Sequence, residues 1–296
     1  MQKIYLSDVG PKVSPAVYSF FRWEEYSDFN PSELERIVDL CLELGINTFD
    51  HADYYGHYSC EELFGKVISK KTFKRSDIVL FTKAGVRVPH ESHPSVQLKY
   101  IDTSAAHIKE SVEQSLKKLK TDYIDIFLLD HLDPISNLEE TALALESLLK
   151  SGKIKNIGVA NFSVFQHQLL SSYLQNAVVT HHLELNLLNT SALENGQMDY
   201  IKQKYMRPLA SSPLAAGRIA SGTDEHSVKL REHLQKLSPK YQNKDIESIA
   251  VAWLVKLGAL PLIGTKDEQR IRNIVDAFNI QLDHQDWFEL LEVAKK

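Results

Sequence analysis

The chain has 296 residues, of which 43% are hydrophobic and 25% are charged, so it is long enough for one large α/β domain or two ordinary ones. Its formal net charge is −5 and it has no long run of Lys and Arg, which argues against nucleic acid or an acidic membrane surface as a partner. The two cysteines, Cys41 and Cys60, are typical of free thiols in a reducing compartment. The longest apolar run, residues 249–255, is far too short to span a bilayer, and we therefore expect a soluble cytoplasmic protein.

In chain order, short aliphatic or β-branched runs alternate with longer amphipathic stretches. Strands are predicted at residues 16–20, 47–50, 77–83, 123–129, 154–160, 178–185, 207–212 and 260–264. The helices that follow them are predicted at residues 31–44, 60–68, 103–119, 137–151, 163–173, 196–205, 246–257 and 266–278. Eight such units, with strands apolar on both faces, predict a single α/β domain over residues 1–296, folded as a (β/α)8 TIM barrel. A doubly wound parallel sheet is the alternative.

The glycines favour the barrel. None of the twelve has another glycine two residues away, so no G-x-G-x-x-G motif exists, and the spacing from Gly217 to Gly222 is followed by Thr223 rather than Lys. Two long loops are predicted, at residues 85–102 after strand three and at residues 217–244 after strand seven. Such loops lie on the face where barrel active sites form, so they are either walls or lids of a substrate site or plain surface insertions.

Unusual polar groups end three successive predicted strands. Strand two ends at Asp50 with Tyr55 just beyond, strand three ends at Lys83, and strand four ends at Asp130 and His131. A Lys buried at a strand end requires a carboxylate partner, and Asp50 lies on the adjacent strand. A nearby ammonium also favours the phenolate, so we expect Lys83 to lower the Tyr55 pKa and make Tyr55 a general acid. The alternative is a solvated strand end with an incidental ion pair.

The stretch "GINTFDHADYYGHYSCEELFGKVI" resembles the signature of the aldo-keto reductase superfamily, in particular its bacterial NADP-dependent oxidoreductase branch. The later segments "FTKAG", "SGKIKNIGVANFS", "ELN", "SSPLAAGRI" and "LPLIGTKDEQRI" follow in the family's order and spacing, from Val13 to the last helix. The resemblance implies a barrel that binds NADP(H) without a Rossmann motif and transfers hydride to an aldehyde or ketone. It also implies that Tyr55 donates the proton, while Asp50 keeps Lys83 charged.

The family's fourth site residue, a His that ends strand four, aligns with Asp130, and His131 comes one position later. A protonated Asp130 would replace the His as a hydrogen-bond donor, whereas an ionised Asp130 would favour cationic substrates. A third possibility is that the strand end twists, so that His131 faces the mouth and Asp130 turns outward.

The resemblance also implies a set of cofactor contacts. Asn161 matches the residue that binds the nicotinamide carboxamide, and the Ser that normally precedes it is Ala160. The next carboxamide partner, normally Gln, aligns with His182, which is either a contact or a His that fills the barrel wall. Ser211 takes the place of the aromatic residue that stacks on the nicotinamide.

Further contacts are implied at the other end of the cofactor. Leu214 and Gly217 fit the loop that covers the pyrophosphate, and Gly264, Thr265, Lys266 and Arg270 match the segment that binds the ribose 2′-phosphate. This segment opens a helix, where free backbone N–H groups favour an anion, and we therefore expect NADP rather than NAD. Thr265 and Glu268 also fit a T-x-x-E capping box.

A metal site is not expected, because His51, His57, His90 and His93 form only scattered pairs. The first functional hypothesis is therefore an NADP(H)-dependent enzyme that reduces small carbonyl compounds, as a monomer or weak homo-oligomer. The second is a catalytically weak or inactive barrel that binds NADP(H) as a regulatory or redox-sensing subunit, suggested by the changes at Asp130, Ala160, His182 and Ser211.

Overall fold

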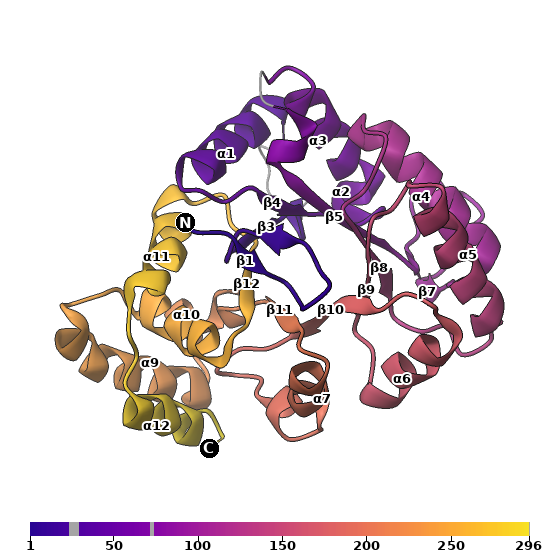
Figure 1. Cartoon of the computed structure of the whole chain (residues 1–296). Helices are drawn as coiled ribbons and strands as arrows, with labels where there is room; N and C mark the ends of the chain where they lie inside the picture. Colours follow the sequence, from indigo (N-terminus) through magenta and orange to yellow (C-terminus); the bar gives the residue numbers. More distant parts are fainter. Residues whose placement is uncertain (24–29, 72–73, 296) are drawn as a thin grey trace.

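The computed structural model describes residues 1–23, 30–71 and 74–295 and contains a closed barrel of eight parallel strands (Figure 1). The strands follow one another around the barrel in chain order, and the last pairs with the first. They are β3 (Val17–Ser19), β4 (Thr48–Asp50), β5 (Val79–Ala84), β8 (Ile126–Asp130), β9 (Ile157–Ala160), β10 (Val178–Glu184), β11 (Arg207–Ser211) and β12 (Leu260–Ile263). The closed barrel confirms the prediction and excludes the open doubly wound sheet.

One main helix follows each barrel strand and packs on the outside, as the alternating pattern predicts (Figure 1). These helices are α1 (Pro31–Glu43), α3 (Cys60–Ile68), α4 (Ala105–Leu119), α5 (Leu138–Lys150), α6 (Val164–Tyr173), α7 (Gln197–Gln203), α10 (Ile246–Leu257) and α11 (Glu268–Asp276). Capping side chains start many of them: Asn30 accepts a hydrogen bond from the Glu33 N–H, and Ser163 forms a capping box with Gln166. Shorter helical turns are α2 (Tyr55–Tyr58), η2 (Arg75–Asp77), η3 (Ser191–Leu193), η4 (Ala215–Gly217) and η6 (Ala277–Asn279).

The barrel interior is packed with apolar side chains rather than open. Phe81, Leu128 and Leu209 are fully buried there. An N-terminal hairpin, β1 (Ile4–Tyr5) and β2 (Lys12–Val13), adds Leu6 and Val13 to the same cluster, and the Leu6 carbonyl accepts a hydrogen bond from the Arg207 N–H at the start of β11. The hairpin therefore covers the amino-terminal end of the barrel, and the opposite, carboxyl-terminal end carries the mouth.

The two segments predicted as long loops differ from each other. Residues 85–102 contain a short antiparallel pair, β6 (Val86–Arg87) with β7 (Tyr100–Ile101). Residues 217–244 are not a loop but are mostly helical, with α8 (Arg218–Ser221), α9 (Glu225–Leu237) and η5 (Ser238–Tyr241). Helix α9 packs against α10 and the C-terminal helix α12 (His284–Ala294) on the flank of the barrel (Figure 1). Within the described part of the chain, no helix has the length and apolar character needed to cross a membrane.

Candidate active site

A buried ion pair lies at the carboxyl ends of β4 and β5. The Lys83 ammonium is 2.7 Å from Asp50 Oδ1 and donates a second hydrogen bond to the His51 carbonyl at 2.8 Å. The Lys83 and Asp50 side chains are 1% and 0% exposed. The Ser19 hydroxyl, at the end of β3, donates to Asp50 Oδ2 at 2.7 Å. The predicted pairing of Lys83 with Asp50 is thus confirmed, and both carboxylate oxygens have a partner.

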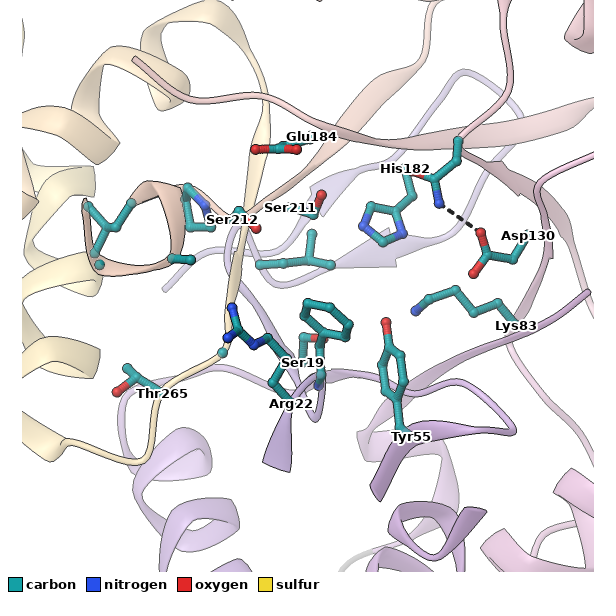
Figure 2. Close-up of a pocket in the computed structure, with 18 of the residues that line it drawn as sticks. Ser19, Arg22, Tyr55, Lys83, Asp130, His182, Glu184, Ser211, Ser212 and Thr265 are labelled. Carbon is teal, nitrogen blue, oxygen red and sulfur yellow. Dashed lines mark hydrogen bonds between the residues drawn. The ribbon is translucent and has the colours of Figure 1, made fainter. Parts of the chain in front are cut away.

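Tyr55 stands next to this pair. The turn after β4 brings the phenol ring to 4.6 Å from the Lys83 ammonium, measured to the ring centroid, and the following residues Gly56 and His57 adopt left-handed backbone conformations. Figure 2 shows the Tyr55 hydroxyl and the Lys83 ammonium pointing into the same space. Among the described residues, no hydrogen-bond partner is found for the Tyr55 hydroxyl, so it is available to a ligand.

The expectation of a lowered Tyr55 pKa is wrong in direction. Burial, together with the negative charges of Asp50 and Asp130, raises the Tyr55 pKa well above the ordinary value of 10. The sequence argument counted only the ammonium, whereas two carboxylates and the loss of water also act on the phenol. Tyr55 is therefore a phenol that keeps its proton at all ordinary pH values.

Asp130 faces the mouth, as the strand pattern predicts, and is 1% exposed. Its Oδ1 accepts a hydrogen bond from Asn161 Nδ2 at 2.7 Å, marked by the dashed line in Figure 2, and lies 2.8 Å from His131 Nδ1. Burial alone would raise the pKa of this carboxyl, but His131, the Lys83 ammonium and Asn161 together hold it below the usual 3.8. The hypothesis of a protonated, hydrogen-bond-donating Asp130 is therefore wrong.

His131 also lines the mouth, although successive strand residues normally face opposite sides. Its backbone has a φ of 61°, a left-handed conformation that ends the extended strand and turns the side chain back toward the cavity. Asn161, directly after β9, has the same feature with a φ of 60°. The proposal that Asp130 turns outward in favour of His131 is therefore wrong, because both side chains reach the mouth.

His182 of β10 is buried in the same wall, and neither of its ring nitrogens has a hydrogen-bond partner among the described residues. Burial, with a smaller contribution from the Lys83 ammonium, lowers the His182 pKa to about 4. The imidazole is therefore neutral near pH 7, with one N–H donor and one acceptor nitrogen.

These side chains line one cavity of about 490 Å³ that runs from the catalytic corner to the loops after β11 and β12. In Figure 2, Tyr55, Lys83, Asp130 and His182 lie toward one end, and Thr265 lies toward the other. Of the residues predicted from sequence for the cofactor, those that line the cavity are Asn161, His182, Ser211, Leu214, Gly217, Gly264, Thr265 and Arg270. Asp50 lies behind Lys83, its ion-pair partner, and does not line the cavity. Lys266 also lies outside the lining formed by the described residues.

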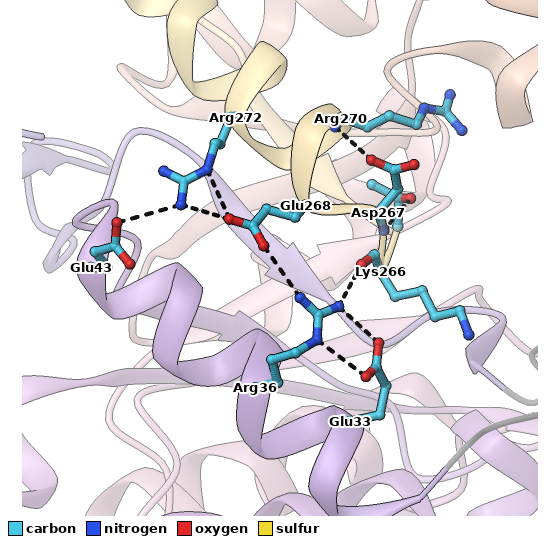
Figure 3. A network of polar contacts seen from close by, with 9 residues as sticks. Glu33, Arg36, Glu43, Lys266, Asp267, Glu268, Arg270 and Arg272 are labelled. Atoms are coloured by element: carbon cyan, nitrogen blue, oxygen red, sulfur yellow. Dashed lines mark hydrogen bonds and ion pairs between the residues drawn. The ribbon is translucent and has the colours of Figure 1, made fainter.

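The segment before α11 is held by a network of charged side chains (Figure 3). Arg36 of α1 donates to the Lys266 carbonyl at 3.1 Å, pairs with Glu33 at 2.9 Å and lies 3.5 Å from Glu268. From the barrel side, the Tyr18 hydroxyl donates to the Thr265 carbonyl at 2.9 Å. The path of the backbone is therefore fixed from two sides.

The expected T-x-x-E capping box is not formed. Asp267 is the N-cap of α11 and accepts from the Arg270 N–H at 3.0 Å, while the Thr265 hydroxyl accepts from the Asp267 N–H at 3.2 Å. Because a carboxylate already occupies this helix start, backbone N–H groups alone are a weaker argument for an anion site here than the sequence suggested. The Arg270 guanidinium, in contrast, lines the cavity and pairs through Nε and Nη2 with Glu247 at 2.8 and 2.7 Å.

Sequence reasoning missed several cavity residues. Ser19, Glu184 and Ser212 line it, as does Lys99, which is the lining residue contributed by the segment 85–102. The position of Ser19 at the end of the first predicted strand was a usable signal, because all strand ends meet at the mouth. The helical residues 218–244 contribute nothing to the described lining, so for them the surface-insertion interpretation holds.

The histidines considered as metal ligands instead stack on aromatic or imidazole rings. The His51 ring stacks on Phe20 at 4.4 Å between centroids, and the His57 ring stacks on His90 at 5.5 Å. The His93 ring stacks on Tyr58 at 4.0 Å. Across residues 1–23, 30–71 and 74–295, no group of three or more His, Cys, Asp or Glu side chains is arranged to hold a metal ion.

A parallel barrel with its polar groups gathered at the carboxyl ends of the strands is the architecture of the (β/α)8 enzymes. The chain belongs to the Aldo/keto reductase family, whose sequence profile matches residues 20–295. It is 38% identical to a 6-dehydroglucose reductase of Agrobacterium fabrum, over 99% of this chain and 98% of the relative. It is also 32% identical to the oxidoreductase YdhF of Escherichia coli, again over 99% and 98% of the two chains. The protein is therefore an oxidoreductase of the aldo-keto reductase type.

The fold is also that of solved structures. A crystal structure of a thermostable aldo-keto reductase superposes with a TM-score of 0.84 at 23% identity, covering 99% of this chain and all of the other. The glycerol dehydrogenase of Gluconobacter oxydans gives a TM-score of 0.86 at 21% identity, covering 98% and 94%. At these identities the likeness supports the barrel architecture alone.

Proposed function

We propose that the protein reduces small aldehydes or ketones with NADPH, and that Tyr55 is the general acid. The observation that carries the proposal is the Tyr55 hydroxyl, which is buried in the cavity without a partner among the described residues and lies beside the paired Lys83 ammonium. The oxidoreductase relatives argue against the alternative of an inactive regulatory or redox-sensing barrel.

The chemistry of the lining fits a nicotinamide dinucleotide. Asn161 and His182 offer amide and imidazole groups for a carboxamide at the catalytic corner, and Ser211 is the neighbouring polar group. At the far end, Gly217 leaves room close to the Arg270 guanidinium, since a Cβ there would lie 4.0 Å from Nη2. Arg270 Nη1 is not engaged by Glu247 and supplies positive charge for a ribose 2′-phosphate.

A nicotinamide cofactor bound in this cavity supplies the hydride that adds to the carbonyl carbon. Tyr55 gives its proton to the carbonyl oxygen, so that a C–H and an O–H bond form, the C=O double bond becomes a single bond, and solvent later reprotonates Tyr55. The Lys83 ammonium, fixed by Asp50 and the His51 carbonyl, stabilises the negative charge that passes through the oxygen and the phenol.

The substrate is a small, polar carbonyl compound on this proposal. The cavity is also lined by Glu184, Lys99 and Ser212, which suit hydroxyl groups better than an apolar chain. Because a relative with 38% identity is named for 6-dehydroglucose, this aldehyde belongs in the first substrate panel.

The test is the consumption of NADPH in the presence of 6-dehydroglucose, a simple aliphatic aldehyde, an aromatic aldehyde and a ketone. Tyr55→Phe should lower the rate by about 10²- to 10⁴-fold, the usual range for a general acid, without loss of NADPH binding. Tyr200→Phe, at a buried tyrosine of α7 outside the cavity, is the matched control and should keep the rate. NADPH binding without turnover across the panel would support the regulatory alternative instead.

A further inference from the structure

His182 is the buried polar side chain in the catalytic corner whose hydrogen-bonding capacity is wholly unused within the described chain. Neither Nδ1 nor Nε2 has a partner there, and the side chain is 6% exposed. In Figure 2 its ring projects from β10 into the space that Tyr55 and Lys83 enter from the opposite side. A buried donor left without a partner costs free energy, so it is expected to be satisfied by a ligand.

We propose that His182 is the second hydrogen-bond donor to the substrate carbonyl oxygen, acting opposite Tyr55. This inference rests on the proposed carbonyl reduction and assigns His182 a catalytic contact in addition to its implied contact with the carboxamide. The oxygen would then lie between a phenol O–H and an imidazole N–H, both of which strengthen their bonds as negative charge develops.

The residue at the end of β8 cannot supply this donor. Asp130 is an ionised carboxylate, which only accepts hydrogen bonds, and its charge would repel an oxygen that becomes negative. His131 directs Nδ1 to Asp130 and is 43% exposed at the rim. Lys83 already uses two of its three donors on Asp50 and the His51 carbonyl. His182 is a neutral donor in the described wall, and neither of its ring nitrogens is engaged by another described residue.

The protonation state of His182 suits this role. The burial that lowers its pKa to about 4 keeps the ring neutral, so it presents one N–H and one acceptor nitrogen over the whole neutral range. The acceptor nitrogen can receive a hydrogen bond from a carboxamide NH2 group, which would fix the tautomer whose N–H points to the substrate. The two contacts use different nitrogens and do not compete.

The test compares His182→Leu with a double variant that also carries Asp130→His. Leucine removes the N–H, so kcat for a simple aldehyde should fall by about 10²-fold, the usual effect of losing one such donor. Placing an imidazole at position 130 restores a donor from the neighbouring wall, so the double variant should recover at least about a tenfold rate over His182→Leu. In the otherwise unmodified protein, Asp130→His should raise kcat much less, because His182 already donates the hydrogen bond to the substrate oxygen.

Two further measurements separate catalysis from structure. The NADPH dissociation constant, from fluorescence titration, should change much less than kcat in His182→Leu. His181→Leu is the matched control, because His181 points to the opposite face of β10 against His167 and should leave kcat unchanged. A His182→Leu enzyme at full rate, or one whose loss is entirely in NADPH affinity, overturns the inference while carbonyl reduction stands. NADPH binding without turnover in the unmodified protein overturns the proposed function itself.

Discussion

Replacing Lys83 with Met tests the buried charges on which the site depends. In the structure, Asp50 Oδ1 accepts from the Lys83 ammonium at 2.7 Å, and Asp50 is completely buried. Methionine keeps the length and the apolar stem but removes the charge, which leaves Asp50 with Ser19 as its hydrogen-bond donor. Breaking a buried pair by removing one partner typically costs about 3 to 5 kcal/mol, because the remaining charge is uncompensated.

This cost converts into a measurable shift of the melting temperature. Globular proteins gain about 2.1 cal/mol/K of unfolding entropy per residue, which for 296 residues is about 0.6 kcal/mol/K. A loss of about 3 to 5 kcal/mol should therefore lower the Tm of Lys83→Met by about 5 to 8 °C. The double variant Asp50→Asn/Lys83→Met removes both charges and should lose clearly less than the sum of the two single losses.

Thermal unfolding followed by circular dichroism, with NADPH absent, provides the measurement. Glu225→Gln is the control, because the Lys229–Glu225 pair has a similar distance, 2.6 Å, but its side chains are 57% and 82% exposed. An exposed pair contributes at most about 1 kcal/mol, so its Tm should hardly change. Two results would refute the inference that the pair is desolvated. One is a Lys83→Met protein that melts within about 1 °C of the unmodified chain. The other is a double variant whose stability loss equals the sum of the two single losses.

Three further predictions concern cofactor choice and pH. Arg270→Met should raise the dissociation constant of NADPH by about 10- to 100-fold, the value of one charge-assisted hydrogen bond, and leave NADH unchanged; equal effects on both cofactors would exclude a 2′-phosphate contact. Burial lowers the pKa values of His167, His181 and His182 to about 4, 3 and 4, so between pH 6.5 and about 4 the unfolded chain binds protons that the native state does not. The urea midpoint should therefore fall as the pH drops through this window, and a constant midpoint would contradict neutral buried imidazoles. Burial raises the Asp53 pKa to about 8, so stability should fall as the pH rises from about 4 to 8. Asp53→Asn should then be more stable than the unmodified chain at about pH 8 and similar to it near pH 4, and the reverse order would show an ionised Asp53.

The fold and the positions of the catalytic candidates could be predicted because they follow from local patterns. Apolar strand runs and amphipathic helices alternate eight times, and all strand ends of a parallel barrel meet at one mouth. Asp50, Lys83 and Asp130 therefore come together from three strands whatever their neighbours are. The pairing of Lys83 with Asp50 followed from the cost of burying an ammonium alone.

The features that could not be predicted depend on the combined effect of neighbouring groups, whose positions in space the sequence does not give. The Tyr55 pKa is raised by burial and by the charges of Asp50 and Asp130, and neither the degree of burial nor the proximity of Asp130 was known. The second inward side chain at the end of β8 requires the left-handed backbone at His131, which no residue pattern signalled. At α11 the sequence pattern predicts Thr265 as the cap, whereas the structure uses Asp267.

The departures from the family pattern at the mouth are linked by charge. A carboxylate at position 130 places a second negative charge near Lys83, which would be costly without donors, and Asn161 and His131 supply contacts to its Oδ1. Burial, together with the charges of Asp50 and Asp130, raises the Tyr55 pKa, so the phenol holds its proton in the resting state. Under the proposed function, such a phenol gives up its proton only to an oxygen that has become strongly basic through hydride transfer. Proton transfer from Tyr55 is therefore coupled to hydride transfer. A neutral donor that stabilises this oxygen is then needed more than in a site with a weaker negative field, and the neutral His182 meets that need. The carboxylates of Asp50 and Asp130 both retain hydrogen-bond partners in this arrangement, so neither buried charge at the mouth is left unpaired.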